Sequence, residues 1–174
     1  MKDPRAAALE ASILRQLRGN GVAVPEVISC EGNLLILETL PGEPLPDVIE
    51  RGGYDPESIA VALCDWFAAF YAGAPGELRG DVNGRNFLWD GETMRGVDFE
   101  ARCHGPLSRD AGRLAAFIET YETRGKAAQT ALSRAFMRGF SERFRCGMDD
   151  ILAERETERL AMRERRAAAR TFSP

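Results

Sequence analysis

The stretch from Leu78 to Pro106 constrains the fold most, because it sets two short apolar runs among glycines and polar residues. Phe87-Leu88-Trp89 and Gly96-Val97 predict two short strands, and Asp90-Gly91 between them predicts the turn that joins them. After Pro106 the apolar residues recur at helical spacing to the end of the chain. This half of the chain therefore predicts a small β region followed by helices.

The preceding part mixes helix and hairpin. Asp3 and Pro4 predict the start of a helix that Asn20-Gly21 ends, and Pro56 to Ala72 carries a second amphipathic helix. Between them, Val27–Ser29 and Leu34–Leu37 predict a hairpin, followed by a connector from Leu40 to Pro46. The whole pattern is α+β, with helix dominating the second part.

Composition excludes several classes of protein. The chain has 174 residues, enough for one domain, and a net charge of −4, which is unlike the basic surplus of nucleic-acid binders. A single histidine and four cysteines without CxxC spacing exclude zinc ribbons and three-histidine metal sites. No apolar run reaches the ~18 residues of a membrane span, and the first residues lack the apolar core of a signal peptide. We expect a cytoplasmic protein with no membrane and no nucleic-acid partner.

Three oxygen-bearing side chains converge in the predicted β region. Asp81 and Asn86 stand on one loop before the first strand, and Asp98 follows the second. The hairpin turn brings Asp98 back beside that loop. Carboxylate and amide oxygens suit Mg²⁺, which binds through one or two carboxylates plus substrate phosphates. The chemistry that needs such a site is phosphoryl transfer, with one Asp as base and an Asn and a second Asp on the metal.

The segment resembles the H-G-D-x-x-x-x-N…I-D-F-[DE] signature of the aminoglycoside and choline phosphotransferases, the small-molecule branch of the protein-kinase fold. LEASILRQLRGNGVAVPEVI, LLILETLPGEPL and GPLSRDAGRLAAF also resemble segments of that family, in the same order. The resemblance implies a protein-kinase-like fold. Residues 1–40 would form a reduced N-terminal lobe of a helix plus a hairpin. Residues 41–174 would form a mainly helical C-terminal lobe with a small catalytic hairpin.

The resemblance also implies residue roles. Asp81 corresponds to the catalytic base, and Asn86 and Asp98 to the metal ligands. Asp110 corresponds to a buried aspartate that braces the catalytic loop. The nucleotide-binding positions are the helix glutamate Glu10, the hinge backbone at Glu38 and Leu40, and Lys2 for the phosphate-binding lysine.

The chain departs from the family at several positions. No glycine-rich hairpin precedes the first helix, and Lys2 and Lys126 are the only lysines. Arg79 replaces the histidine of the family signature, and Asn83 replaces a usual histidine or lysine. Arg85 is the residue that could supply the missing positive charge in the loop.

The expected function is transfer of the γ-phosphate of ATP or GTP, with Mg²⁺, to a hydroxyl of a small molecule. The acidic residues near the site favour a cationic alcohol as the acceptor. The alternative is a catalytically inactive nucleotide-binding or scaffold protein, because the covering loop is missing. A homodimer or a partner could complete the N-terminal lobe. A metal-dependent hydrolase that uses the same carboxylates without ATP is a third interpretation.

Overall fold

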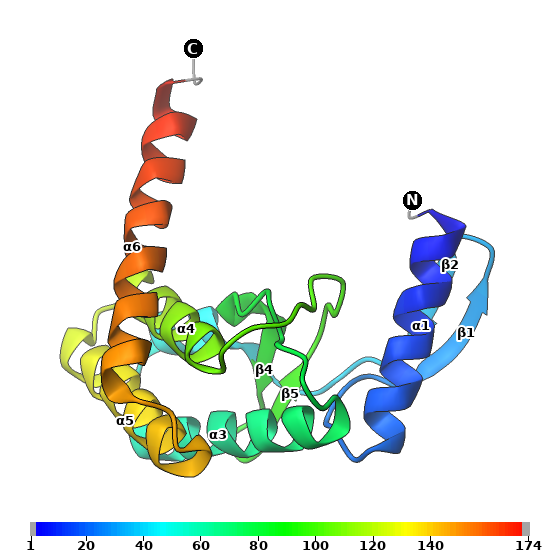
Figure 1. Cartoon of the computed structure of the whole chain (residues 1–174), viewed down its shortest axis with the longest axis horizontal. Helices are drawn as coiled ribbons and strands as arrows, with labels where there is room; N and C mark the ends of the chain where they lie inside the picture. The colour runs from blue at the N-terminus through cyan, green and yellow to red at the C-terminus, as the bar shows by residue number, and fades with distance from the viewer. Residues whose placement is uncertain (1–2, 172–174) are drawn as a thin grey trace.

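The computed structural model describes residues 3–171 and has the expected α+β architecture. Helices α3 to α6 form the larger part, and α1 with the β1–β2 hairpin lies beside it (Figure 1). The helices are α1 Pro4–Gly19, α2 Leu45–Arg51, α3 Pro56–Gly73, α4 Ser108–Thr120, α5 Lys126–Phe144 and α6 Met148–Thr171, with the short 3₁₀ helix η1 at Gly84–Asn86. The strands are β1 Val27–Glu31, β2 Leu34–Leu37, β3 Glu43–Pro44, β4 Phe87–Trp89 and β5 Met94–Gly96.

The first unit is α1 packed on a two-stranded sheet. Asp3 caps the helix by accepting a hydrogen bond from the Arg5 N–H at 3.2 Å, and Pro4 stands in its first turn. β1 and β2 pair antiparallel, as the sequence predicts. Leu14 and Leu17 of α1 are buried, whereas Ile28 and Leu34 of the hairpin are exposed. Only one face of the hairpin is therefore covered.

A cluster of aromatic rings holds the larger part together. Trp66, Phe67 and Phe70 project from α3, and Trp66 and Phe67 both pack edge-on or tilted against Phe87 of β4 at centroid distances of 5.2 and 5.8 Å. Phe99, just after β5, lies 6.3 Å from Phe70 in a stacked arrangement. The apolar face predicted for residues 56–72 is thus the platform on which the β4–β5 hairpin rests.

The segment predicted as a connector contains regular structure. β3 pairs with β4, which makes a three-stranded sheet in the order β3-β4-β5, and α2 follows immediately. The prolines at 44 and 46 do not prevent this, because Pro46 occupies the first turn of α2, where the missing N–H needs no partner. The connector prediction for Leu40 to Pro46 was therefore wrong at its C-terminal end.

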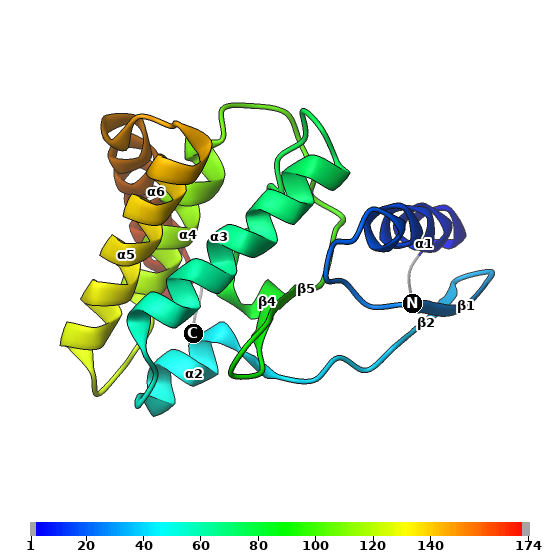
Figure 2. The same ribbon diagram turned by 90° about the horizontal axis from the view of Figure 1, so that it is seen from below.

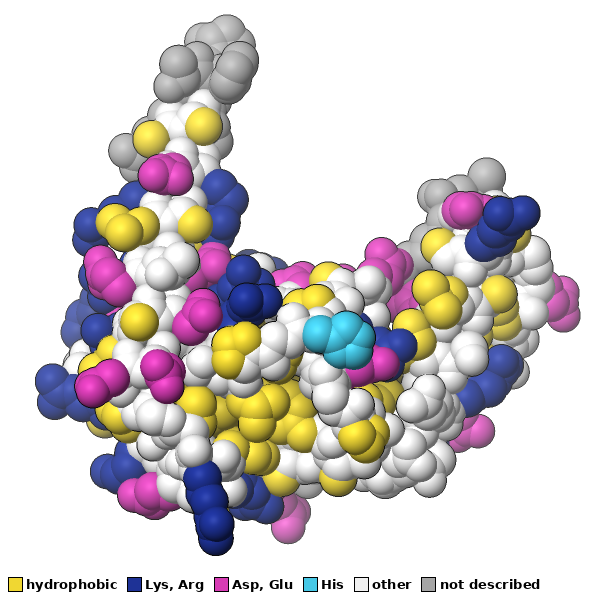
Figure 3. Space-filling view, viewed as in Figure 1, with side chains coloured by type: hydrophobic (Ala, Val, Ile, Leu, Met, Phe, Trp, Pro, Cys, Tyr) yellow, Lys and Arg dark blue, Asp and Glu magenta, His cyan; other side chains and the backbone are white. Residues whose placement is uncertain are grey.

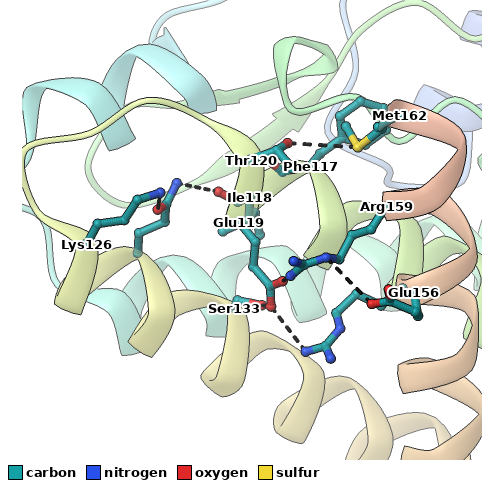
Figure 4. Close-up of polar contacts among 11 residues, drawn as sticks. Phe117, Ile118, Glu119, Thr120, Lys126, Ser133, Glu156, Arg159 and Met162 are labelled. Carbon is teal, nitrogen blue, oxygen red and sulfur yellow. Dashed lines mark hydrogen bonds and ion pairs between the residues drawn. The ribbon is translucent and has the colours of Figure 1, made fainter. Parts of the chain in front are cut away.

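Helices α4, α5 and α6 are tied by one carboxylate. Glu119 of α4 accepts hydrogen bonds from Ser133 of α5 at 2.8 Å and from Arg155 and Arg159 of α6 at 3.3 and 2.8 Å (Figure 4). Much of the charge on the last helix is thus used in packing it against α4. None of the helices among residues 3–171 is long and apolar enough to cross a lipid bilayer.

Few hydrogen bonds join the α1–hairpin unit to the rest. The carbonyl of Ala23 accepts from the Trp66 indole at 3.1 Å and from the Gly96 N–H at 3.0 Å, and the Asn20 amide donates to the Gly73 carbonyl at 2.8 Å. Figure 2 shows α3 between this unit and the helices α4 to α6. Figure 3 shows the surface hollowed between α6 and the α1–hairpin unit.

Candidate functional site

Asp81 lies in a loop that its own side chain helps to fix. Its Oδ2 accepts a hydrogen bond from the Asn86 amide at 3.0 Å, and its Oδ1 accepts one from the Asn83 N–H at 3.1 Å. Asn86 is nearly buried and also donates to the Asp81 carbonyl at 3.3 Å. Because both bonds use the Asn86 nitrogen, its Oδ1 is left without a partner among residues 3–171. The structure therefore brings together Asp81 and Asn86, as expected.

Tyr121 anchors the middle of the same loop. Its hydroxyl accepts a hydrogen bond from the Gly84 N–H at 2.8 Å and donates one to Asn83 Oδ1 at 3.2 Å. Burial raises the pKa of Tyr121 to about 12, so the hydroxyl keeps its proton at neutral pH. Asn83 Oδ1 also accepts from the Arg85 N–H at 3.0 Å, while the Arg85 side chain is exposed. Tyr121 lies 37 residues from Gly84 in the sequence, and no local pattern indicates this contact.

Asp110 braces the start of the loop. Its carboxylate is fully buried and accepts hydrogen bonds from the N–H groups of Arg79 at 2.7 Å and Gly80 at 3.2 Å, and from the Tyr71 hydroxyl at 3.0 Å. Burial raises the pKa of Asp110, and these donors partly oppose that effect. The bracing role expected for Asp110 is confirmed.

Arg79 is buried beneath the segment that carries Asp98. Its guanidinium donates to the Val97 carbonyl and lies 4.4 Å from the centre of the Phe99 ring. Burial lowers the pKa of Arg79 to about 10, so it stays charged at neutral pH. Arg79 thus contacts both neighbours of Asp98 and puts a positive charge behind that segment.

Asp98 lies in a strained turn near Asn86. Its φ is 61°, which is unusual for a residue with a side chain, and such strain tends to occur at functional sites. The neighbouring Val97 N–H donates to the Asn86 carbonyl at 3.0 Å. The carboxylates of Asp98, Glu10 and Glu100 can approach within 4.8 Å of one another. These three carboxylates offer the hard oxygen donors that suit a cation such as Mg²⁺.

In the described part of the chain, the expected hinge has two open backbone donors, at Thr39 and Leu40. Among residues 3–171, the Leu40 N–H has no hydrogen-bond partner, whereas the Glu38 N–H donates to the Glu26 carbonyl at 2.9 Å. The Glu38 carboxylate accepts from Arg18 at 2.9 Å, which fixes the segment against α1. Lys2, expected to bind phosphate, lies outside the described residues.

Two cavities differ in their relation to these residues. One of about 340 Å³ is lined by the Asp81 loop together with α4 and α6. A larger one of about 680 Å³ lies between α2, the start of α3 and the β4–β5 turn. The charged side chains that line it already have partners: Glu43 pairs with Arg51, Asp90 pairs with Arg95, and Asp55 caps α3 through the Ser58 N–H. The smaller cavity is therefore the one that adjoins the converging polar residues.

Comparison with known proteins does not identify a family for this chain. No protein-family model matches the chain, and a search of curated proteins finds none that matches it.

Proposed function

We propose that the protein is a phosphotransferase of protein-kinase-like fold that moves the γ-phosphate of ATP or GTP to a hydroxyl of a small molecule. One observation carries the proposal. Asp81 is held by Asn86 on a loop that Asp110 braces, and the strained Asp98 segment is bonded to the same Asn86. A base, an amide oxygen and a second carboxylate in one place suit phosphoryl transfer.

Asp81 is the proposed base. Its carboxylate is oriented by Asn86 and by the Asn83 N–H, so it can take the proton of an acceptor hydroxyl without first reorganising. Asn86 Oδ1 and the Asp98 carboxylate would hold Mg²⁺, which neutralises charge on the nucleotide phosphates when it is bound. Arg79, buried behind Phe99, keeps Asp98 in its left-handed conformation.

The nucleotide would lie between the two units. The Leu40 N–H and the Glu38 carbonyl are the proposed hydrogen-bonding contacts for the purine ring of the nucleotide. Arg85, exposed on the loop, would contribute positive charge near the phosphates. Glu10 and Lys2 complete the proposed set of nucleotide-side residues.

A specific observation also favours a second candidate, an inactive nucleotide-binding or scaffold protein. Among residues 3–171, no glycine-rich hairpin and no lysine-bearing strand packs over the site, and the first unit has only α1 and two strands. An open phosphate site lets water compete with the acceptor. Under the first proposal, a second copy or a partner chain would supply the cover.

Calorimetric titration with ATP, with and without Mg²⁺, tests the nucleotide site. We expect Mg²⁺-dependent binding by the native protein, loss of that binding in Asp98→Ala, and retention in Asp149→Ala, an exposed aspartate at the start of α6. Unchanged binding of Mg·ATP by Asp98→Ala would remove Asp98 from the site. No binding by any of the three proteins would contradict the phosphotransferase and any nucleotide-binding role, and would leave a scaffold that does not use nucleotide.

A second substitution separates the enzyme from the scaffold. Asp81→Asn keeps one side-chain oxygen for the Asn83 N–H, and the Asn86 amide keeps its bond to the Asp81 carbonyl, but the new amide cannot accept a proton. We expect it to bind Mg·ATP normally and to lower phosphorylation of an acceptor by ~10²–10⁴-fold. Measured nucleotide binding without turnover of any alcohol, in native protein and variant alike, would favour the scaffold.

A further inference from the structure

The cavity beside Asp81 has walls from four separate parts of the chain, one of which is the segment after β5 with Ala101 and Cys103. The loop contributes Asp81 and Val82, α4 contributes Arg113 and Phe117, and α6 contributes Glu158 and Arg165. Its volume of about 340 Å³ is enough for a small ligand. Any molecule bound there would lie next to the proposed base.

The charge in this cavity is organised around one carboxylate. Glu158 is only 8% exposed. Each of its two carboxylate oxygens pairs with a different arginine. Arg113 Nε lies 3.5 Å from Oε2, and Arg165 Nη2 donates to Oε1. The three side chains together carry one net positive charge. The Nη1 and Nη2 groups of Arg113 have no partner among residues 3–168, whose side chains the structure describes.

The other acidic residues that favour a cationic acceptor do not line this cavity. Asp90 lies in the β4–β5 turn, bonded to Arg95, and borders the larger cavity. Asp98 and Glu100 group with Glu10. Among the described residues, Asp81 and Glu158 are the only carboxylates that line the cavity, and Glu158 is already neutralised.

We propose that the acceptor carries an anionic group, a carboxylate or a phosphate, which Arg113 and Arg165 bind while its hydroxyl reaches Asp81. This rests on the proposed phosphotransferase function. The hydroxyl oxygen forms the new bond to the γ-phosphorus, and the bond to the β–γ bridging oxygen breaks, so that ADP or GDP leaves. The hydroxyl proton passes to Asp81 and then to solvent. Guanidinium groups suit this role because their N–H donors match carboxylate and phosphate oxygens.

A matched panel of three-carbon alcohols tests the preference. Glycerate and glycerol 3-phosphate carry an anion, glycerol is neutral, and 3-amino-1,2-propanediol is a cation. With Mg·ATP, we expect phosphorylated product from an anionic probe and little from the other two. Arg113→Ala and Arg165→Ala should raise KM for that probe ~10- to 100-fold with little change in kcat. Arg163→Ala, on the same helix but away from the cavity, should leave both unchanged.

A binding measurement separates failure of this inference from failure of the proposed function. Inorganic phosphate is titrated into ¹⁵N-labelled protein while the arginine Nε–H signals are followed by NMR. We expect saturable shifts that Arg113→Ala and Arg165→Ala abolish, that Arg113→Lys weakens, and that Arg163→Ala retains. Such shifts without nucleotide binding would support the anion site and contradict the phosphotransferase. Turnover that prefers the neutral or cationic alcohol, or phosphate shifts absent or insensitive to both arginines, would overturn the anion site.

Discussion

The carboxylate of Asp110 decides the shape of the proposed catalytic loop. It is fully buried, and it accepts hydrogen bonds from three donors of the loop and of α3, namely the N–H groups of Arg79 and Gly80 and the Tyr71 hydroxyl. A buried carboxylate is costly unless such donors surround it. Asp110 therefore links correct folding of α3 and α4 to the position of Asp81.

Replacing Asp110 by Asn tests this link at a single residue. If the amide oxygen takes the donors of Arg79 and Tyr71, its NH₂ group faces the Gly80 N–H, donor against donor. We expect a loss of roughly 3–5 kcal/mol in the free energy of unfolding, measured by urea denaturation. Tyr71→Phe removes one hydrogen bond and should cost only about 1 kcal/mol. If the two substitutions lowered the free energy of unfolding equally, the Asp110 carboxylate would not be the group on which these hydrogen bonds depend.

At the level of elements, the contact between α4 and α6 depends on a glycine. A Cβ added to Gly112 of α4 would lie 2.6 Å from the Ile151 carbonyl and the Arg155 nitrogen, both in the α6 backbone. Real Cβ atoms do not approach backbone so closely, so one helix would have to move. Because α6 carries Arg165 and Glu158, this displacement reaches the cavity beside Asp81.

Gly112→Ala should therefore separate α6 from α4. We expect a loss of about 1–3 kcal/mol in stability from overpacking, and a weaker response to phosphate in the arginine NMR signals. Gly19→Ala, in the last turn of α1 where a Cβ meets nothing within 4 Å, is the control and should not lower stability. A Gly112→Ala protein as stable as the native one would mean that the two helices adjust without cost.

Local signals in the sequence were sufficient for most elements. The cap at Asp3, the two apolar runs at 27–29 and 34–37 and the apolar spacing of residues 56–72 predicted α1, the hairpin and α3 close to their observed bounds. Helix α2 was missed because its prolines suggested a connector, although they fall at positions that tolerate proline.

The candidate site could be predicted only for residues that are close together in the sequence or joined by one hairpin. Asp81 and Asn86 are five residues apart, and a hairpin brings back Asp98. Tyr121 and Arg165 reach the loop through the packing of α4 and α6, which no periodicity specifies. The contacts of these two residues therefore could not be predicted from the sequence and are known only from the structure.

On the scale of the whole molecule, the α1–hairpin unit is attached by few bonds and covered on one face. A two-stranded sheet is marginally stable by itself, and Ile28 and Leu34 expose 65% and 57% of their surface. Helices α3 and α5, in contrast, share the aromatic core. We infer that the two parts differ in local stability, and that a nucleotide held by both would couple them.

Hydrogen exchange measured by mass spectrometry tests that coupling. Without ligand, amides of the hairpin should exchange faster than those of α3 and α5, because their opening exposes little buried surface. Mg·ATP should slow exchange at Leu40 and in the 81–86 loop together, since the proposed site uses both. The same ligand should slow neither segment in Asp98→Ala. Protection confined to the loop would place the nucleotide on the larger part alone, and α1 with its hairpin would then be a separate docking element rather than a lobe of the site.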